Sequence, residues 1–232
     1  MILFALPLGA QTIRVIDFYE PKREKTAEFR AAIGDYNSVM RKAGGTDWYT
    51  MWNSLSGPSE YIRIQDYEKW ADLDKPPKVS TRNNAELAAV DQRIRDANQS
   101  TRRVVMRLAP DASLPLVSQA SPAVLIRWMS VPLGHAQESI DLMKSDLLPA
   151  VKKSGITDFS IWRAFFGTRQ GQIVRFEGIE GWAVFDKPDP VAVAAGDTAY
   201  QRFLSKANPL MTEAREDVYR FRPELSYLPP KK

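Results

Sequence analysis

The chain has 232 residues, of which 44% are hydrophobic and 26% charged, a balance typical of one large globular domain or two smaller ones. The 32 basic and 28 acidic residues are interspersed, which argues against nucleic-acid binding because such proteins usually carry a basic stripe. The absence of cysteine excludes disulfides and thiolate chemistry, and a single histidine, His135, argues against zinc. We expect no metal and no cofactor, although a carboxylate site for magnesium or calcium stays open.

Residues 1–10, MILFALPLGA, form a short apolar segment that ends in small residues. The pattern resembles the remnant of an export signal cleaved after Ala10, although no basic region precedes it. This interpretation predicts a periplasmic or secreted protein. If the segment is merely apolar, we expect a cytoplasmic one. No later apolar run is long enough to predict a membrane span.

The next part of the chain alternates strand and helix patterns. Residues 12–19 are β-branched and aromatic and predict a strand, and 25–42 carry apolar residues on one helical face, starting at Phe29. Gly44 and Gly45 end this helix. The elements that follow are strands at 46–52 and 60–67, a short helix at 68–75, a helix at 84–99 and a strand at 102–108.

The second part of the chain shows the same order of patterns. A helix at 199–216 carries Pro209, which predicts a bend or an interruption there. The predicted elements are a strand at 123–131, a helix at 137–153, strands at 157–162 and 172–179, the helix at 199–216 and a strand at 217–222.

One phrase occurs twice, as RIQDYEKWADLDKP at 63–76 and as RFEGIEGWAVFDKP at 175–188, with seven of fourteen positions identical. Further matches follow in the same order at offsets of 110 to 113, among them Ile13-Arg14 with Ile126-Arg127. The offset changes by one residue inside the strand at 46–52, which predicts a β-bulge. We infer a tandem duplication. Its parts are a first unit at 11–110, a linker at 111–122, a second unit at 123–226 and a tail at 227–232.

Each unit reads β-α-β-β-α-β, the ferredoxin-like pattern. The order of elements, the aromatic hairpin and the Trp-to-Asp segment after the third strand resemble the dimeric α+β barrel superfamily. That group includes the antibiotic-biosynthesis-monooxygenase-like, NIPSNAP-like and EthD-like families. The resemblance implies an α+β fold in which two ferredoxin-like units pair through their sheets, here within one chain. It also implies that oxygenation without metal or flavin is open to such a protein.

Strand alternation suggests where a ligand could bind. Arg63 alternates with Ile62 and Ile64, and we expect the aliphatic pair to face the helices and Arg63 to face the other sheet or solvent. An aromatic cavity between the two sheets would suit a flat apolar ligand, although aromatic residues at strand spacing are more often core. The candidate ligand-binding residues are Trp48, Trp52, Arg63, Trp162 and Arg175.

Other residues carry weaker functional signals. Trp70 and Trp182 in the doubled phrase could form paired sites, but repetition favours a shared scaffold role. His135 precedes a helix and reads as a surface residue, while the resemblance raises it as a haem axial ligand. The sequence lacks the P-loop, the dinucleotide fingerprint and the nucleophile elbow.

These observations identify no catalytic residue. They favour an α+β barrel that binds a small apolar or aromatic molecule between its two sheets, with cofactor-free, monooxygenase-like oxidation as its enzymatic form. The alternative is a non-enzymatic exported module for protein interaction or assembly. Homo-oligomerisation is compatible with both functions and required by neither.

Overall fold

The computed structural model describes residues 12–75, 84–117 and 121–230. The expected export signal at 1–10 lies outside these residues. Within the described ranges, no helix is both long enough and apolar enough to cross a membrane.

The first half of the chain has the predicted order of elements. They are β1 (Ile13–Pro21), η1 (Arg23–Lys25), α1 (Thr26–Lys42), β2 (Thr50–Ser54), β3 (Tyr61–Tyr67), η2 (Trp70–Asp72), α2 (Asn84–Ala97) and β4 (Asn98–Leu108). The second half repeats the order after the short helix η4 (Pro110–Ala112), with its helices divided into more segments. They are β5 (Ala123–Ser130), α3 (Ala136–Leu142), η5 (Met143–Leu147), α4 (Leu148–Ser154), β6 (Phe159–Phe166), β7 (Gln172–Ile179), η6 (Trp182–Asp186), α5 (Pro190–Ala195), α6 (Asp197–Ala207), η7 (Asn208–Leu210) and β8 (Glu213–Phe221).

The eight strands close into one barrel in the order β1-β3-β2-β8-β5-β7-β6-β4. The two halves join at both edges, because β2 pairs with β8 and β4 pairs with β6, both antiparallel. The joins are short, since β2 pairs with β8 only at Tyr219–Phe221 and β6 pairs with β4 only at Val105–Leu108. The predicted fold class, an α+β barrel of two ferredoxin-like units within one chain, is confirmed.

The interior of the barrel is filled with apolar side chains from alternate strand positions. The cluster consists of Ile16, Phe18, Trp52, Ile62, Ile64, Val104, Met106, Val124, Ile126, Trp128, Trp162, Ala164, Val174, Phe176 and Tyr219. Trp52 and Trp162 both point inward as members of this cluster. However, packed side chains occupy the space between the sheets where the sequence analysis placed a cavity.

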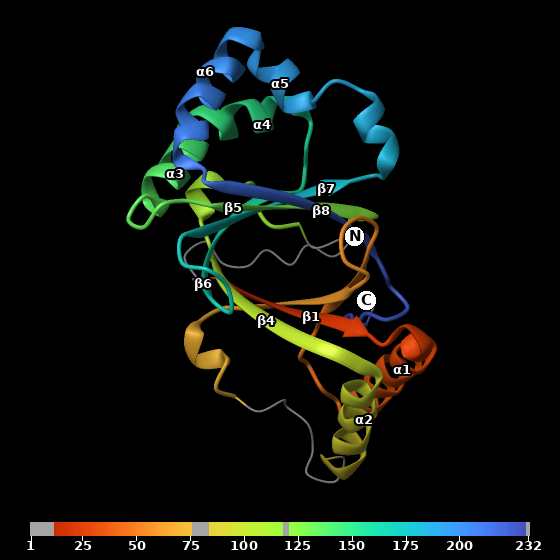
Figure 1. The fold of residues 1–232 in the computed structure, drawn as a ribbon. Coiled ribbons are helices and arrows are strands. Elements are labelled where there is room, and N and C mark those ends of the chain that lie inside the picture. The colour runs from red at the N-terminus through yellow and green to blue at the C-terminus, as the bar shows by residue number, and fades with distance from the viewer. Residues whose placement is uncertain (1–11, 76–83, 118–120, 231–232) are drawn as a thin grey trace.

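The helices cover the two outer faces of the barrel (Figure 1). α1 and α2 pack on the first half, where Phe29, Ile33 and Met40 are buried as predicted. The helices α3 to α6 form a larger layer over the second half. Both faces of each sheet half are therefore buried over much of their area. The space between sheet and helices, rather than the barrel interior, is where this architecture leaves room.

Two stretches expected to be helical are strands in the structure. The helix expected at 199–216 ends at Ala207, and the chain is already in β8 from Glu213. The polar stretch after Pro209 is extended because its backbone pairs with β5, where Glu213 lies opposite Ser130. Likewise β4 begins at Asn98, directly after α2. In both places strand pairing overrides local helix propensity.

The strand registers correct three further details. The pairing of β2 with β3 is regular, and the register shifts fall instead at Glu20/Pro21 and Val105/Met106. The match of Ile13 with Ile126 is out of register, since Ile13 lies on the outer face and Ile126 inside. Tyr227, assigned to the tail, is buried and exchanges backbone hydrogen bonds with Tyr49.

The joint between the halves gives a direct test of the closed barrel. Gly167 follows β6, has φ +77° and would place a Cβ 1.7 Å from the Arg103 carbonyl oxygen on β4. Gly196 has the same φ but open space around its Cβ position. We expect Gly196→Ala to cost about 1–2 kcal/mol of unfolding free energy from backbone strain alone. Gly167→Ala should cost about 1–3 kcal/mol more from overpacking. Equal losses in urea unfolding would contradict this contact.

Candidate functional site

Arg63 and Arg175, the first residues of the doubled phrase, hold equivalent positions on β3 and β7. Both point away from the barrel interior, because Ile62 and Ile64 flank Arg63 and lie in the interior cluster. The expectation that Ile62 and Ile64 face the helices was wrong. The physical reason is that both faces of β3 are buried, so alternation alone could not tell the inside from the outside.

Each arginine belongs to a row of three residues that lie opposite one another on adjacent strands. In the first half Asp17 on β1 lies between Arg63 on β3 and Arg103 on β4. In the second half Arg127 on β5 lies between Arg175 on β7 and Glu216 on β8. The two rows occupy the same places in the barrel but carry different charges, Arg-Asp-Arg in the first and Arg-Arg-Glu in the second.

In the first row the central carboxylate satisfies both arginines. Asp17 Oδ2 accepts from Arg63 Nη2 at 2.6 Å and from Arg63 Nε at 3.1 Å, and Asp17 Oδ1 accepts from Arg103 Nε at 2.6 Å. Burial alone would raise the pKa of Asp17, but the two guanidinium groups outweigh it and hold the pKa below its ordinary value. Burial raises the pKa of neighbouring Tyr19 to about 12. This row is a closed ion network.

The second row leaves its outer arginine incompletely paired. Arg127 binds Glu216, so that carboxylate is already engaged. Arg175 Nη2 lies 3.3 Å from Glu177 Oε2, while Arg175 Nε is buried and donates no hydrogen bond within the described residues. Burial, followed by repulsion from Arg127, lowers the pKa of Arg175. Burial also raises the pKa of Glu177, so both partners shift toward neutrality and the pairing does not offset their desolvation.

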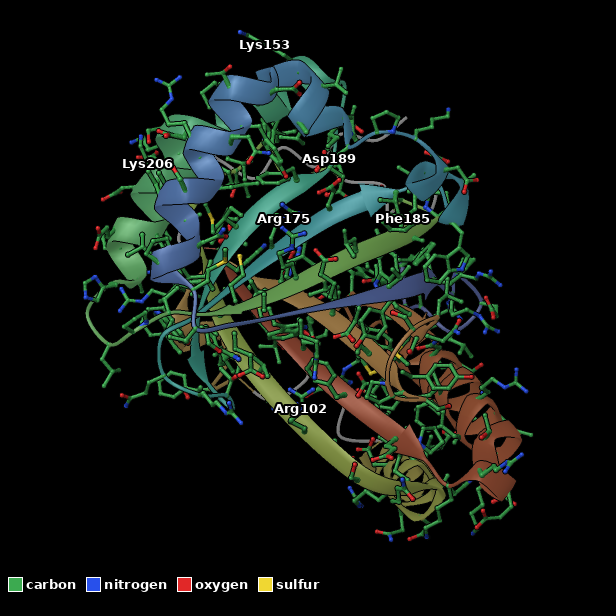
Figure 2. All side chains as sticks on the ribbon, turned by 45° about the horizontal axis from the view of Figure 1, so that its top comes forward. Arg102, Lys153, Arg175, Phe185, Asp189 and Lys206 are labelled. Carbon is green, nitrogen blue, oxygen red and sulfur yellow. The ribbon has the colours of Figure 1, made fainter. Side chains whose placement is uncertain are left out.

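Arg175 lines a cavity between the second sheet half and its helices, which we call the Arg175 pocket. Its lining residues are Arg127, Met129, Val131, Ser139, Leu142, Met143, Leu147, Arg175, Tyr200, Phe203, Leu204, Ala207, Leu210 and Met211. Figure 2 shows Arg175 on the helix-covered face of the sheet, with Asp189 farther out on the same side. The cavity volume is about 40 Å³. Ser139 Oγ is also buried without a hydrogen-bond partner within the described residues.

One wall of the Arg175 pocket is a π-helical turn. η5 interrupts the helix between α3 and α4 and contributes Met143 and Leu147 to the lining. Pro149 lies two residues after η5, and its missing N–H and bulky ring explain why the regular bonding pattern is broken in the turn before it. Such π turns are frequent at functional sites because they displace side chains from the regular helical positions.

The matching space in the first half is larger and polar. This cavity of about 610 Å³ is lined by Arg63, Arg103 and several tyrosines and acidic residues. Its cations are engaged in ion pairs, because Arg63 and Arg103 both bind Asp17 and Lys75 lies 2.6 Å from Asp72. The first-half cavity is therefore lined mainly by polar and charged side chains, whereas the Arg175 pocket is lined mainly by apolar ones.

The five candidate residues from the sequence lie in four separate places. Trp52 and Trp162 are core residues whose indole N–H groups donate to Thr50 Oγ1 and Ser160 Oγ. Trp48 stacks on Tyr227 with 4.7 Å between ring centroids. Arg63 and Arg175 lie in the two separate sheet–helix cavities. The ligand-binding role of each residue stays a prediction.

Sequence reasoning missed the helical residues of the Arg175 pocket. Ser139 is only 4% exposed and lies beside buried Ile140 at the start of α3. A small polar residue on an otherwise apolar helix face was the signal available. Tyr200 and Phe203 on α6 carried no such signal, because their spacing reads as ordinary core.

The single histidine does not line either cavity. His135 precedes α3, its side chain is half exposed, and Nδ1 lies 2.7 Å from Glu138 Oε2. The surface interpretation fits this position, and the chain has no histidine in the Arg175 pocket to bind haem iron. The described residues also contain no group of three or more His, Cys, Asp or Glu side chains suited to a metal ion.

Comparison with solved structures identifies the fold. The chain is similar to an anthrone oxidase-like protein, with 11% identity over 92% of each chain and a TM-score of 0.61. The corresponding values for a provisionally assigned monooxygenase from Lactobacillus acidophilus NCFM are 7% identity, 91% and 94% coverage and a TM-score of 0.62. Chlorite dismutase from Candidatus Nitrospira defluvii is 10% identical over 93% of each chain, with a TM-score of 0.58. The chain has the α+β barrel fold of these proteins, closed here within one chain. No family model and no curated protein matches the sequence.

The depressed pKa of Asp17 predicts a pH-dependent contribution to stability. The folded value lies below the unfolded value of about 3.9, so this contribution is present above about pH 4 and is lost as pH falls through the folded pKa. Asp17→Asn should lower the unfolding free energy by about 3–5 kcal/mol at neutral pH and remove this part of the acid dependence. Asp35→Asn, which breaks an exposed pair with Arg93, should cost at most about 1 kcal/mol. Equal losses in urea unfolding would contradict the network.

Proposed function

We propose that the chain binds a small apolar or aromatic molecule in the Arg175 pocket, and that its enzymatic form is oxygenation of that molecule by dioxygen without a cofactor. The observation that carries the proposal is a largely apolar pocket lined by Arg175 and Ser139, whose buried Nε and Oγ atoms have no hydrogen-bond partner within the described residues. Buried polar groups in native proteins are normally paired, and the exceptions call for an explanation. A bound molecule that accepts hydrogen bonds would supply it.

The pocket must widen to admit a ring system, because about 40 Å³ holds little more than one water molecule. Its walls suit such a change. Met129, Met143 and Met211 have unbranched, adaptable side chains that can repack around a ligand. The π turn η5 is a second adaptable element, since its backbone is already irregular. We therefore expect binding to proceed by rearrangement of the helical wall over an unchanged sheet.

The comparisons support the oxygenase form at the level of fold. An anthrone oxidase-like protein and a provisionally assigned monooxygenase share this architecture. Anthrone is a suitable probe because it is flat and apolar and has one carbonyl oxygen. In its oxidation the central methylene loses two hydrogens and gains one oxygen atom, and the second oxygen atom of dioxygen leaves as water.

The pocket residues could promote that reaction through charge. Removing one proton from the methylene gives an enolate, whose electron-rich ring can reduce dioxygen directly. A cation beside the enolate oxygen stabilises this anion, most strongly where water is excluded. Arg175 is the buried cation that lines the pocket. The proposal assigns it this electrostatic role.

A blocked pocket tests the proposal. We expect the protein to consume oxygen with anthrone in a saturable manner, measured with an oxygen electrode, and to bind anthrone by fluorescence titration. Leu204→Trp should fill the pocket and abolish both signals. Leu133→Trp, at a position 72% exposed and outside the pocket, should change neither. Anthrone oxidation and binding at the wild-type level in Leu204→Trp would contradict the proposed site.

An exposed aromatic pair favours the non-enzymatic alternative as a second candidate. Trp182 and Phe185 on η6 are 51% and 50% exposed, whereas the matching Trp70 lies against Phe165 and Phe166 of the other half. Every copy of the chain carries Phe165 and Phe166. We therefore assign another copy of the chain as the partner of the exposed Trp182 and Phe185. Light scattering decides between the candidates. Association that Trp182→Ser abolishes, together with no ligand binding, would favour the assembly function.

A further inference from the structure

We propose that the molecule bound in the Arg175 pocket carries one oxyanion, a carboxylate or an enolate-type oxygen, on an otherwise apolar body. Arg175 Nε and Ser139 Oγ are the donors that hold it. This inference rests on the proposed function and adds the charge of the ligand. Its basis is a comparison of two arginines that occupy equivalent places in one barrel.

The comparison concerns the same atom in both halves. Arg63 Nε donates to Asp17 at 3.1 Å, and Arg63 Nη2 donates to the same carboxylate at 2.6 Å. Arg175 Nε is buried and lacks any such acceptor within the described residues. The difference arises on the central strand, where Arg127 replaces the carboxylate that Asp17 supplies. The second half therefore keeps the cation of the duplicated position but not its anion.

The acidic groups around Arg175 are committed to other contacts. Glu216 pairs with Arg127 across the strands. Asp189 accepts from the backbone N–H of Val191 at 2.8 Å, where it caps α5, and from the Tyr200 hydroxyl at 3.2 Å. Glu177 contacts Arg175 at Nη2, at 3.3 Å, and makes no hydrogen bond to Nε. The Nε–H is thus left as a donor for an acceptor that enters the pocket.

Ser139 supplies the second donor from the opposite wall. Its hydroxyl could have bonded to a carbonyl one turn earlier in the chain, as serine often does in helices, but it makes no hydrogen bond within the described structure. A guanidinium N–H from the sheet and a hydroxyl from α3 together resemble the donor pairs that stabilise oxyanions. The remaining lining, including Met129, Met143 and Phe203, is apolar. This combination fits an apolar monoanion.

Two naphthalene probes of similar size separate the contribution of the ligand's charge to binding from that of its apolar surface. Naphthoate carries a carboxylate, and naphthylmethanol carries a neutral hydroxyl at the same ring position. Titration calorimetry should show wild-type protein binding naphthoate about tenfold or more tightly than naphthylmethanol, because hydrogen bonds to charged groups are the stronger class. Arg175→Met should remove this preference by weakening naphthoate binding alone. Arg175→Lys should retain part of it, and Ser139→Ala should reduce it.

Arg169→Met is the matched control, because it removes an arginine whose side chain is 78% exposed and pairs with Glu213 away from the pocket. It should leave the affinity for both probes unchanged. Thermal unfolding of each variant confirms that the compared proteins are folded. If both probes bind equally and Arg175→Lys has no effect, the oxyanion inference fails while the apolar site stands. If neither probe binds wild-type protein, the proposed function fails as well.

Discussion

Closure of the eight-stranded sheet is the constraint on which the rest of this structure depends. Because β2 pairs with β8 and β4 with β6, every strand residue is assigned either to the barrel interior or to the helix-covered outside. The interior is an apolar core that includes Trp52 and Trp162. Charged groups also occur inside the barrel, where Arg14 pairs with Asp66 and lies over the Trp162 ring. In the space between sheet and helices, equivalent positions on β3 and β7 put one arginine in each half.

The two arginines show how one scaffold can hold a structural group and a candidate functional group in matching places. Asp17 accepts hydrogen bonds from Arg63 and Arg103, so each of the three charged groups has a partner of opposite charge. Arg127 at the corresponding position of β5 instead pairs with Glu216. Arg175 Nε is then left buried without an acceptor within the described residues. An unsatisfied buried donor lowers the free energy of unfolding by about 1–3 kcal/mol. A catalytic or ligand-binding role is one explanation for such a group in a native protein. The repeat itself marks the scaffold, and the difference within the repeat marks the candidate site.

The sequence predicted the order of elements because periodicity is a local signal, whereas the barrel was implied by the resemblance to the dimeric α+β barrel superfamily. It did not predict that Arg63 faces the helices, since side chains on both faces of β3 are buried or partly buried. The prediction of a helix up to Glu216 was wrong because this stretch pairs with β5. That pairing is a long-range contact, which helix propensity does not take into account. Ser139 escaped notice because a pocket between α3 and β7 joins residues that no sequence pattern connects.

The central claim concerns the residue on the middle strand of each row, Asp17 or Arg127. This residue decides whether the neighbouring arginine, Arg63 or Arg175, is structural or available to a ligand. The direct test is the double variant Arg127→Asp with Glu216→Arg, which gives the second row the Arg-Asp-Arg charges of the first. Its affinity for naphthoate is measured by titration calorimetry beside its thermal unfolding. We predict a folded protein whose preference for naphthoate over naphthylmethanol is lost although Arg175 is intact. A folded double variant that binds naphthoate as tightly as the wild type would contradict the claim.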